Sequence, residues 1–193
     1  MSRKVLWVDT ETTGVNRSRS AVIEIAALVE IDYQVICEFN ETMAPFPGAD
    51  INVQALKING RTRAEIMTFP PPNVTLANFA AFLDQYIDAY NKADKFAPAG
   101  FKIDFDTDFL RNAYKREGFP YFGSYVSTAC IDVMTYVGEA VAGGLLSLPN
   151  NKLKTLCDHF EIPLDAHKPM NDIYATRTLY AIIGEVLRGE RKG

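Results

Sequence analysis

Two carboxylates stand one residue apart at the end of the first apolar stretch of the chain. Asp9 and Glu11 follow the apolar run 5–8, and a Thr-Thr-Gly turn comes directly after them. Side chains alternate across a strand, so Asp9 and Glu11 project from the same face. Two such acids repel each other unless a cation lies between them, and carboxylate oxygens suit a divalent metal ion. The alternative is a strand end in solvent; the apolar run and the turn favour the metal site.

A third acid, Asp106, lies in a segment with helical spacing of its apolar residues. Asp104 and Asp108 fall on a stripe with basic residues, and Asp108 can pair with Arg111 three residues later, which indicates a solvated face. Asp106 instead aligns with Leu110 on the apolar side. A carboxylate there needs a partner, and a metal ion shared with the first two acids would provide one. The alternative is that Asp106 caps the start of this helix.

The fourth acid and a histidine flank the beginning of the last predicted helix. Pro169 fits the first helical turn, where its missing N–H costs nothing, and Asp172 aligns with Thr176 on the buried stripe. His167 lies just before this helix, in backbone able to bring it toward a substrate. The sequence leaves both a catalytic and a structural role open for His167, whereas His159, beside an aromatic residue on a packed helix, is predicted to be structural.

The first of these acids must be positioned by a strand that continues into a hairpin. The apolar run 5–8 predicts a buried strand, and residues 21–31 and 35–40 predict an antiparallel hairpin around a tight turn at 32–34. Glu24, inside the hairpin, is predicted to face solvent or the sheet edge, and we assign it no role.

Helices and single strands alternate along the rest of the chain. A capping box that begins at Thr62 predicts a short helix. Thr75 is the predicted N-cap of a longer helix, whose apolar face continues to Tyr90. Further strands are predicted over 95–100 and 121–131. The remaining helices are predicted over 104–117, from 131 to 141, around 153–160 and over 173–187. This order predicts one α/β domain, residues 1–193, around a mixed sheet with the first strand at its centre.

Composition excludes several classes of protein. The formal charge of −4 argues against a protein that coats nucleic acid by bulk electrostatics, although it leaves room for a local basic rim. Cys37, Cys130 and Cys157 show no zinc or disulfide spacing, so each is predicted to be a buried small residue in a reducing compartment. No apolar stretch reaches the roughly 18 residues of a membrane span or forms a signal sequence. We therefore expect a soluble, cytoplasmic protein without a membrane partner.

Three motifs, in this order, resemble those of the DEDD 3′→5′ exonucleases. They are Asp9-Thr10-Glu11-Thr12-Thr13-Gly14, then Phe105-Asp106-x-x-Phe109-Leu110, then His167 followed five residues later by Asp172. The His-x-x-x-x-Asp spacing is that of the DEDDh, or DnaQ-like, subgroup. The stretch 58–65 is also similar to the Ile-His-Gly-Ile-Thr segment common between the first two motifs. The resemblance spans nearly the whole chain and implies an RNase H-like fold, with a central mixed five-stranded sheet, an antiparallel hairpin and flanking helices.

Two positions depart from the family pattern. The family often has His-Asn just before the second motif, where this chain has Phe101 and Lys102, and usually has Ala where this chain has Pro169. Neither departure removes a metal ligand. Phe101 could stack on a base and Lys102 could contact a phosphate, or both are ordinary residues at the end of a strand.

The resemblance also implies a role for each motif residue. Four acids hold two Mg²⁺ or Mn²⁺ ions around the scissile phosphate, and His167 acts as general base. The four acids are Asp9, Glu11, Asp106 and Asp172. The residues expected to contact the substrate are Thr10, Thr12, Val15, Phe101, Lys102 and Phe105.

The implied function is a metal-dependent 3′→5′ exonuclease that releases nucleoside 5′-monophosphates from single-stranded DNA or frayed 3′ ends. The alternatives are an exoribonuclease of the same fold, a proofreading subunit or binding module beside a polymerase, and a phosphotransferase that cuts internally. DNA is favoured over RNA as the partner, but no motif in the sequence reads the 2′-OH. The oligomeric state and any polymerase partner stay open.

Overall fold

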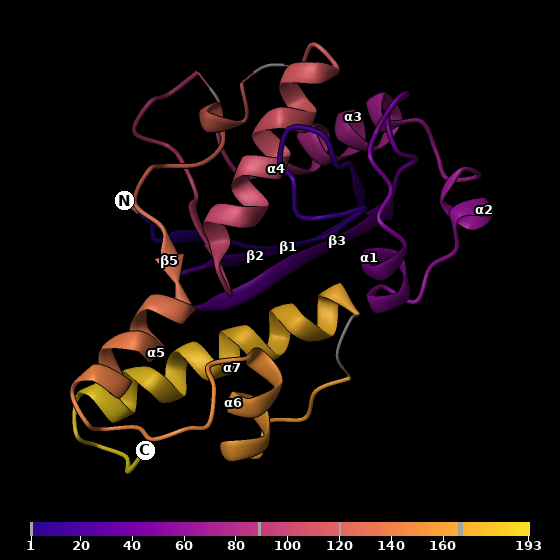
Figure 1. Cartoon of the computed structure of the whole chain (residues 1–193). Helices are drawn as coiled ribbons and strands as arrows, with labels where there is room; N and C mark the ends of the chain where they lie inside the picture. Colours follow the sequence, from indigo (N-terminus) through magenta and orange to yellow (C-terminus); the bar gives the residue numbers. More distant parts are fainter. Residues whose placement is uncertain (1, 89, 120, 166–167) are drawn as a thin grey trace.

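Five strands form one mixed sheet through the middle of the protein, with helices on both faces (Figure 1). The computed structural model describes residues 2–88, 90–119, 121–165 and 168–193. The strands are β1 (Lys4–Thr12), β2 (Val22–Ile31), β3 (Gln34–Thr42), β4 (Ala97–Gly100) and β5 (Ile131–Asp132). Their order is β3-β2-β1-β4-β5, and β1 pairs antiparallel with β2 and parallel with β4. The predicted five-stranded mixed sheet with a central first strand is therefore confirmed.

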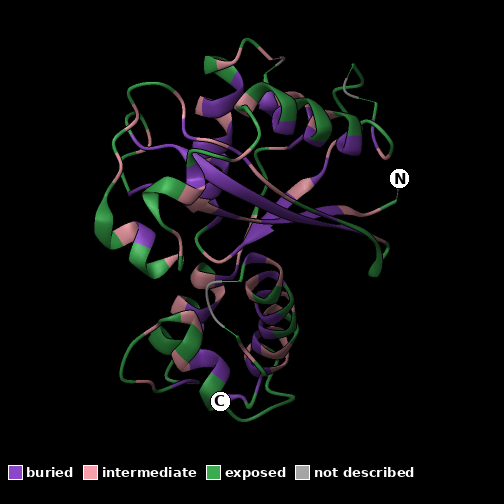
Figure 2. Cartoon of the chain, turned by 90° about the vertical axis from the view of Figure 1, so that its right-hand side faces the viewer, coloured by how far each residue is buried: buried purple, intermediate pink, exposed green. Residues whose placement is uncertain are grey.

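The helices form a layer on each face of this sheet. One layer holds α3 (Pro72–Leu83) and α4 (Ile103–Arg116), and the other holds α5 (Val133–Ala142), α6 (Leu153–His159) and α7 (Pro169–Leu187) (Figure 1). Leu6 and Val8 of β1 pack toward the first layer, whereas Val5 and Trp7 pack toward the second. Because β1 and β2 are covered on both sides, they are buried along almost their whole length (Figure 2).

Two short helices pack against the beginning of β2. They are α1 (Val53–Ile58) and α2 (Arg63–Ile66), whose residues Leu56 and Ile66 pack on Ile23 in a small cluster of their own. The predicted capping box is confirmed: the Thr62 hydroxyl accepts from the backbone N–H of Glu65, and the Glu65 carboxylate accepts from the backbone N–H of Thr62.

The hairpin and the last helix also follow their local sequence. Asp32 and Tyr33 both adopt positive φ, of 48° and 68°, which gives the two-residue turn whose twist suits an antiparallel hairpin. Pro169 stands in the first turn of α7 as predicted. Among the described residues no helix is long and apolar enough to cross a membrane.

The third helix differs from the prediction at both ends. It begins at Pro72, because proline is tolerated where the first N–H has no helical acceptor. Thr75 lies inside it rather than at its N-cap, and its hydroxyl donates to the Thr42 carbonyl at 2.9 Å. The helix ends at Leu83, so Ile87 reaches the core from a loop, and Tyr90 is 98% exposed instead of continuing the apolar face.

The strand predicted over 121–131 is mostly wrong. A 3₁₀ helix, η1 (Phe122–Ser124), occupies its beginning, and regular pairing is confined to β5. The aromatic residues that suggested a strand bury their rings instead: Phe122 and Tyr125 pack against Tyr114 of α4. Tertiary packing here overrides β-propensity, which reflects a fit to a half-buried surface more than a backbone preference.

The cysteine prediction is correct only in part. Cys157 is buried among the helices of the second layer, whereas Cys37 on the edge strand β3 and Cys130 in the loop before β5 are exposed. The first five residues of β3 are exposed, so the helices that bury Phe39 do not cover Cys37.

Candidate active site

Three carboxylates converge where β1 ends beside the first turn of α7. Asp9, Glu11 and Asp172 each offer one oxygen atom, and these atoms lie within 4.8 Å of one another. Asp9 and Glu11 point to the α7 side because they alternate in step with Trp7, whose ring meets Tyr180 of α7 at 5.8 Å between centroids. Three clustered carboxylates form an oxygen donor set that fits a hard divalent cation such as Mg²⁺ or Mn²⁺.

Asp106 approaches the same strand end from the other layer of helices. It lies in the first turns of α4, is only 3% exposed, and its Oδ1 accepts from the backbone N–H of Thr10 at 2.9 Å and from the Thr10 hydroxyl at 2.7 Å. The alternative of a helix cap is wrong, because Lys102 occupies the N-cap position of α4. Asp106 is also the strongest neighbouring charge on Asp9, so the four acids share one electrostatic site.

Three of these acids, Asp9, Glu11 and Asp106, lie where their own charge is disfavoured. Burial, followed by the charge of Asp106, raises the pKa of Asp9 well above its usual value. Burial, followed by neighbouring carboxylates, raises the pKa of Glu11 to about 7. Burial also raises the pKa of Asp106 to about 7, although the hydrogen bonds from Thr10 oppose that rise. A bound cation would relieve this repulsion, which supports the fit of the site to a metal ion.

Glu24 belongs to this neighbourhood, and the expectation that it faces solvent is wrong. It is 7% exposed, its Cα lies opposite that of Glu11 in the β1–β2 ladder, and its carboxylate is the strongest neighbouring charge on Glu11. Arg61, just after α1, donates to Glu24 at 2.8 Å and to Glu65 at 2.7 Å. Sequence reasoning missed both residues; pairing the hairpin strand with β1 would have placed Glu24 beside Glu11.

Of the residues expected to contact substrate, the two threonines use their hydroxyl groups in hydrogen bonds within the protein. Thr10 is buried and bonded to Asp106, so it orients that acid. Thr12 is also buried and donates to the carbonyl of Gly14 at 2.8 Å, while the side chain of Asn59 donates to the carbonyl of Thr12 at 3.0 Å. The turn after the acids is therefore held rigidly from two sides.

The remaining candidates differ in their exposure. Val15 is 85% exposed and Lys102 is exposed with φ of 65°, whereas Phe101 and Phe105 are half-buried. The Phe105 ring packs on Phe109 with centroids 4.7 Å apart. Val15 and Lys102 are thus the two most accessible of the candidates near the acids.

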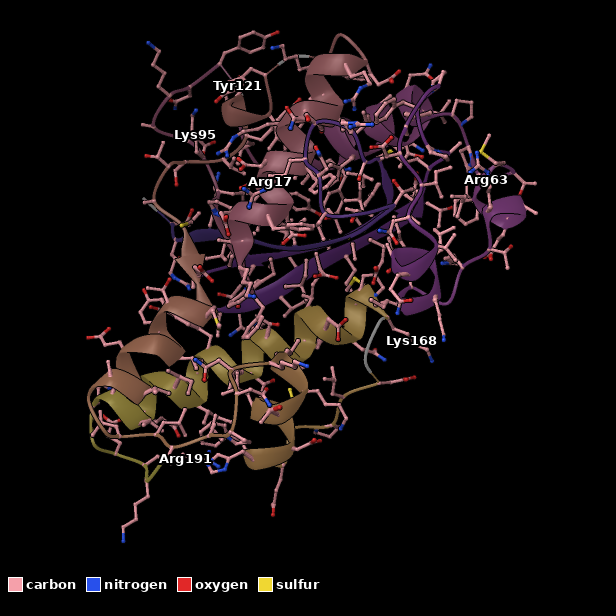
Figure 3. All side chains as sticks on the ribbon, viewed as in Figure 1. Arg17, Arg63, Lys95, Tyr121, Lys168 and Arg191 are labelled. Atoms are coloured by element: carbon pink, nitrogen blue, oxygen red, sulfur yellow. The ribbon has the colours of Figure 1, made fainter. Side chains whose placement is uncertain are left out.

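A basic residue fastens the loop after β1 to α4. Arg17 lies in front of α4 (Figure 3) and pairs with Asp104 at 2.7 Å and with Asp108 at 3.5 Å. Asp108 also pairs with Arg111 at 3.0 Å, which confirms the predicted i,i+3 pair. Asp104 is exposed as predicted, whereas Asp108 and Arg111 are half-buried.

Of the two histidines, the structure describes only His159. His167 lies outside the described residues, so its predicted role as general base stays a prediction. His159 is exposed at the end of α6, where its ring packs against Phe160 with centroids 4.6 Å apart; its structural role stays a prediction.

The central mixed sheet, its two helical layers and the acids at the end of β1 define an RNase H-like exonuclease domain. The family model described as "Exonuclease" matches residues 6–180. The chain therefore belongs to this exonuclease family, as the three motifs predicted.

The individual proteins that the chain resembles share less than 30% of its sequence. The chain is 27% identical over 195 residues to a PolC-type DNA polymerase III from Lacticaseibacillus paracasei, covering 97% of this chain and 12% of that protein. It resembles the zinc-bound complex of Escherichia coli exonuclease I with single-stranded DNA, with a TM-score of 0.77, 19% identity, and coverage of 99% of this chain and 42% of the other. It also resembles E. coli exonuclease I in complex with a dT13 oligonucleotide, with a TM-score of 0.74 and 18% identity. That match covers 98% of this chain and 42% of the other. The chain thus spans about an eighth of the matched polymerase and about two fifths of exonuclease I.

Proposed function

We propose that residues 1–193 form one metal-dependent 3′→5′ exonuclease domain, which hydrolyses single-stranded DNA and releases nucleoside 5′-monophosphates. The observation that carries this proposal is the convergence of Asp9, Glu11 and Asp172 within 4.8 Å, with the buried Asp106 beside them. A binding module that had lost its chemistry would have little reason to keep four buried or half-buried acids together, because their mutual repulsion destabilises the fold.

Each acid of the motifs takes a role that its position supports. Asp9, Glu11, Asp106 and Asp172 would hold two divalent cations, Mg²⁺ or Mn²⁺. When bound, such a pair stabilises charge on the attacking and leaving oxygens of an in-line displacement at phosphorus. The hydrogen bonds from Thr10 fix the orientation of Asp106 before substrate arrives. His167 would accept the proton of the attacking water, a task that histidine side chains commonly perform near neutral pH.

The DNA strand would enter past the exposed residues near these acids. Val15 offers an apolar contact to the terminal nucleotide, and Lys102 a charge for a phosphate. Phe101 and Phe105 are half-buried and would contribute an edge for stacking. Thr12 shapes the turn behind the terminal nucleotide.

Single-stranded DNA is favoured because the structures of E. coli exonuclease I that this fold resembles were solved with single-stranded DNA. The likeness to a PolC-type DNA polymerase favours, as a second candidate, a proofreading role beside a polymerase. An exoribonuclease of the same fold is the third candidate, and the cytoplasm stays the predicted location.

A strand-degradation assay tests the proposal directly. 5′-Labelled single-stranded DNA and RNA of one sequence are incubated with Mg²⁺, with Mn²⁺ or with EDTA, beside a circular single-stranded DNA. We expect a ladder that shortens from the 3′ end, only with metal, faster on DNA than on RNA, and no cleavage of the circle. Cleavage of the circle would identify an endonuclease, and the absence of any ladder with metal would contradict the proposal.

Variants assign the activity to the site. Asp106→Ala is expected to lower the rate by at least about 10³-fold, since it removes a predicted metal ligand, while the fold persists because a buried charge is removed as well. His167→Ala is expected to lower the rate by about 10²–10⁴-fold. Asp104→Asn, on the exposed face of the same helix, is the matched control and should stay within about twofold of wild type. Full activity of folded Asp106→Ala would remove Asp106 from the site.

A further inference from the structure

A partly buried ion pair, with the Arg61 side chain 29% exposed, lies directly beside the acid cluster and is not used by the proposed chemistry. The Glu24 side chain is 9% exposed, and its Oε2 lies 2.8 Å from Nη2 of Arg61. The other arm of the same guanidinium, Nη1, lies 2.7 Å from Oε1 of Glu65. Arg61 therefore bridges the hairpin strand β2 to the beginning of α2.

The strand register brings this pair to Glu11. Glu24 and Glu11 are opposite each other in the antiparallel ladder, so their side chains leave the same face of the sheet. Like charges at such positions repel, and Glu24 is the strongest neighbouring charge on Glu11. Among the main charges acting on Glu11, Arg61 is the one of opposite sign. Arg61 thus reduces the repulsion that Glu24 exerts on the acid cluster.

The position of Arg61 is fixed by its surroundings. Its backbone N–H donates to the Leu56 carbonyl at 2.9 Å, which closes α1. Its partner Glu65 is held in the capping box with Thr62. The guanidinium also lies 5.4 Å from the centroid of the Phe69 ring. These contacts hold the guanidinium in one position, whereas a solvated surface arginine samples many positions.

We propose that Arg61 is a positioning residue of the acid cluster: it neutralises Glu24 and keeps the Glu24 carboxylate from joining the metal ligands. The inference rests on the proposed metal site. It assigns to the Glu24–Arg61 pair the role of setting the affinity of that site for the divalent cation. Without Arg61, a buried carboxylate beside Glu11 loses its counter-charge and its hydrogen bonds. The cluster then attracts a divalent cation more strongly.

The test is Mn²⁺ binding to the metal-free protein, measured by isothermal titration calorimetry at pH 7.5. Arg61→Gln is expected to bind Mn²⁺ on the order of tenfold more tightly, and Glu24→Gln on the order of tenfold more weakly, because each changes the local charge by one unit. The double variant E24Q/R61Q replaces the ion pair by two neutral amides and should return to within about twofold of wild type. Arg61→Lys keeps the charge and should bind nearly as wild type does.

A matched control comes from the same segment. Arg63, on the exposed side of α2 (Figure 3), carries the same charge two residues further along the chain. Arg63→Gln should leave the Mn²⁺ affinity within about twofold of wild type. A similar tightening in Arg61→Gln and Arg63→Gln would show a general effect of net charge and overturn the assignment.

The remaining outcomes separate this inference from the proposed function. If wild type binds Mn²⁺ but E24Q and R61Q both bind it with wild-type affinity, the pair has no part in the site and this inference alone fails. If wild type binds no Mn²⁺, the proposed metal site itself fails. Should Arg61→Gln not fold, because Glu24 is then buried without its partner, Glu24→Gln and the double variant still decide the question.

Discussion

Glu11 shows, at the scale of one residue, how the site opposes the stability of its own fold. Burial and the facing Glu24 raise its pKa from 4.5 to about 7. A carboxyl whose pKa is higher in the folded than in the unfolded protein holds its proton more tightly when folded. The metal-free protein therefore loses stability as the pH rises from about 4.5 to about 7. Asp106, with its pKa also raised to about 7, adds to the same trend.

Replacing Glu11 by Gln should remove this penalty. In EDTA at pH 8 we expect Glu11→Gln to melt several degrees above wild type, with a difference that shrinks toward zero at pH 4.5, because the wild-type side chain is then protonated as well. The same variant should lose nuclease activity. Thermal unfolding followed by circular dichroism across this pH range measures the difference; an offset that does not change with pH would contradict the pKa shift.

At the scale of elements, the turn into α4 combines backbone strain with a predicted contact to substrate. Lys102 adopts φ of 65°, a region that is unfavourable for any residue with a Cβ, and its N–H donates to Asp132 at 2.9 Å. Asp132 in turn caps α5 through the N–H of Met134. This link ties the end of β5 to the helix that carries Asp106.

Lys102→Gly separates the two properties of this position. Glycine adopts positive φ freely, so the unfolding free energy should rise by about 0.5–1 kcal/mol. Loss of the charge should raise the KM for a DNA strand several-fold. Lys102→Met is the control, since it removes the charge and keeps the strain: it should show the higher KM without the gain in urea-induced unfolding free energy. An unchanged KM in both variants would leave Lys102 outside the substrate path.

At the scale of the whole molecule, one buried glutamate joins the sheet to α7 far from the acids. Glu30 lies opposite Val5 in the β1–β2 ladder, four residues from Asp9 along β1, or about 13 Å at 3.3 Å per residue. Burial alone would raise the pKa of Glu30, but hydrogen bonds from Arg177 and Arg3 outweigh it and lower the pKa. The indole N–H of Trp7 also points to this carboxylate, at 3.4 Å.

Arg177→Met should therefore destabilise the fold without changing the chemistry. Removing one of the two cations that neutralise a buried carboxylate costs about 2–4 kcal/mol, whereas activity per folded molecule should stay within about twofold. Trp7 is the only tryptophan in the sequence and is 1% exposed, so its fluorescence reports urea-induced unfolding. Loss of activity in the fully folded variant would show that this end of the sheet communicates with the acids.

The sequence by itself determined the elements and residues whose signals are local. Alternation along β1 placed Asp9 and Glu11 on one face, helical spacing placed Asp106 and Asp172 on packed sides, and the Asp32–Tyr33 turn set the hairpin. These patterns depend on residues at most four apart, so they can be identified without the fold. The family followed from the order of the same motifs.

The tertiary structure alone decided which distant groups meet. Glu24 faces Glu11, Arg61 reaches Glu24 from outside the sheet, and Thr10 fixes Asp106 from another element. The segment around Phe122 forms a 3₁₀ helix with the Phe122 ring buried in the core, in place of the expected strand. Each of these outcomes depends on strand register or on layer packing between segments far apart in sequence, where burial outweighs local propensity.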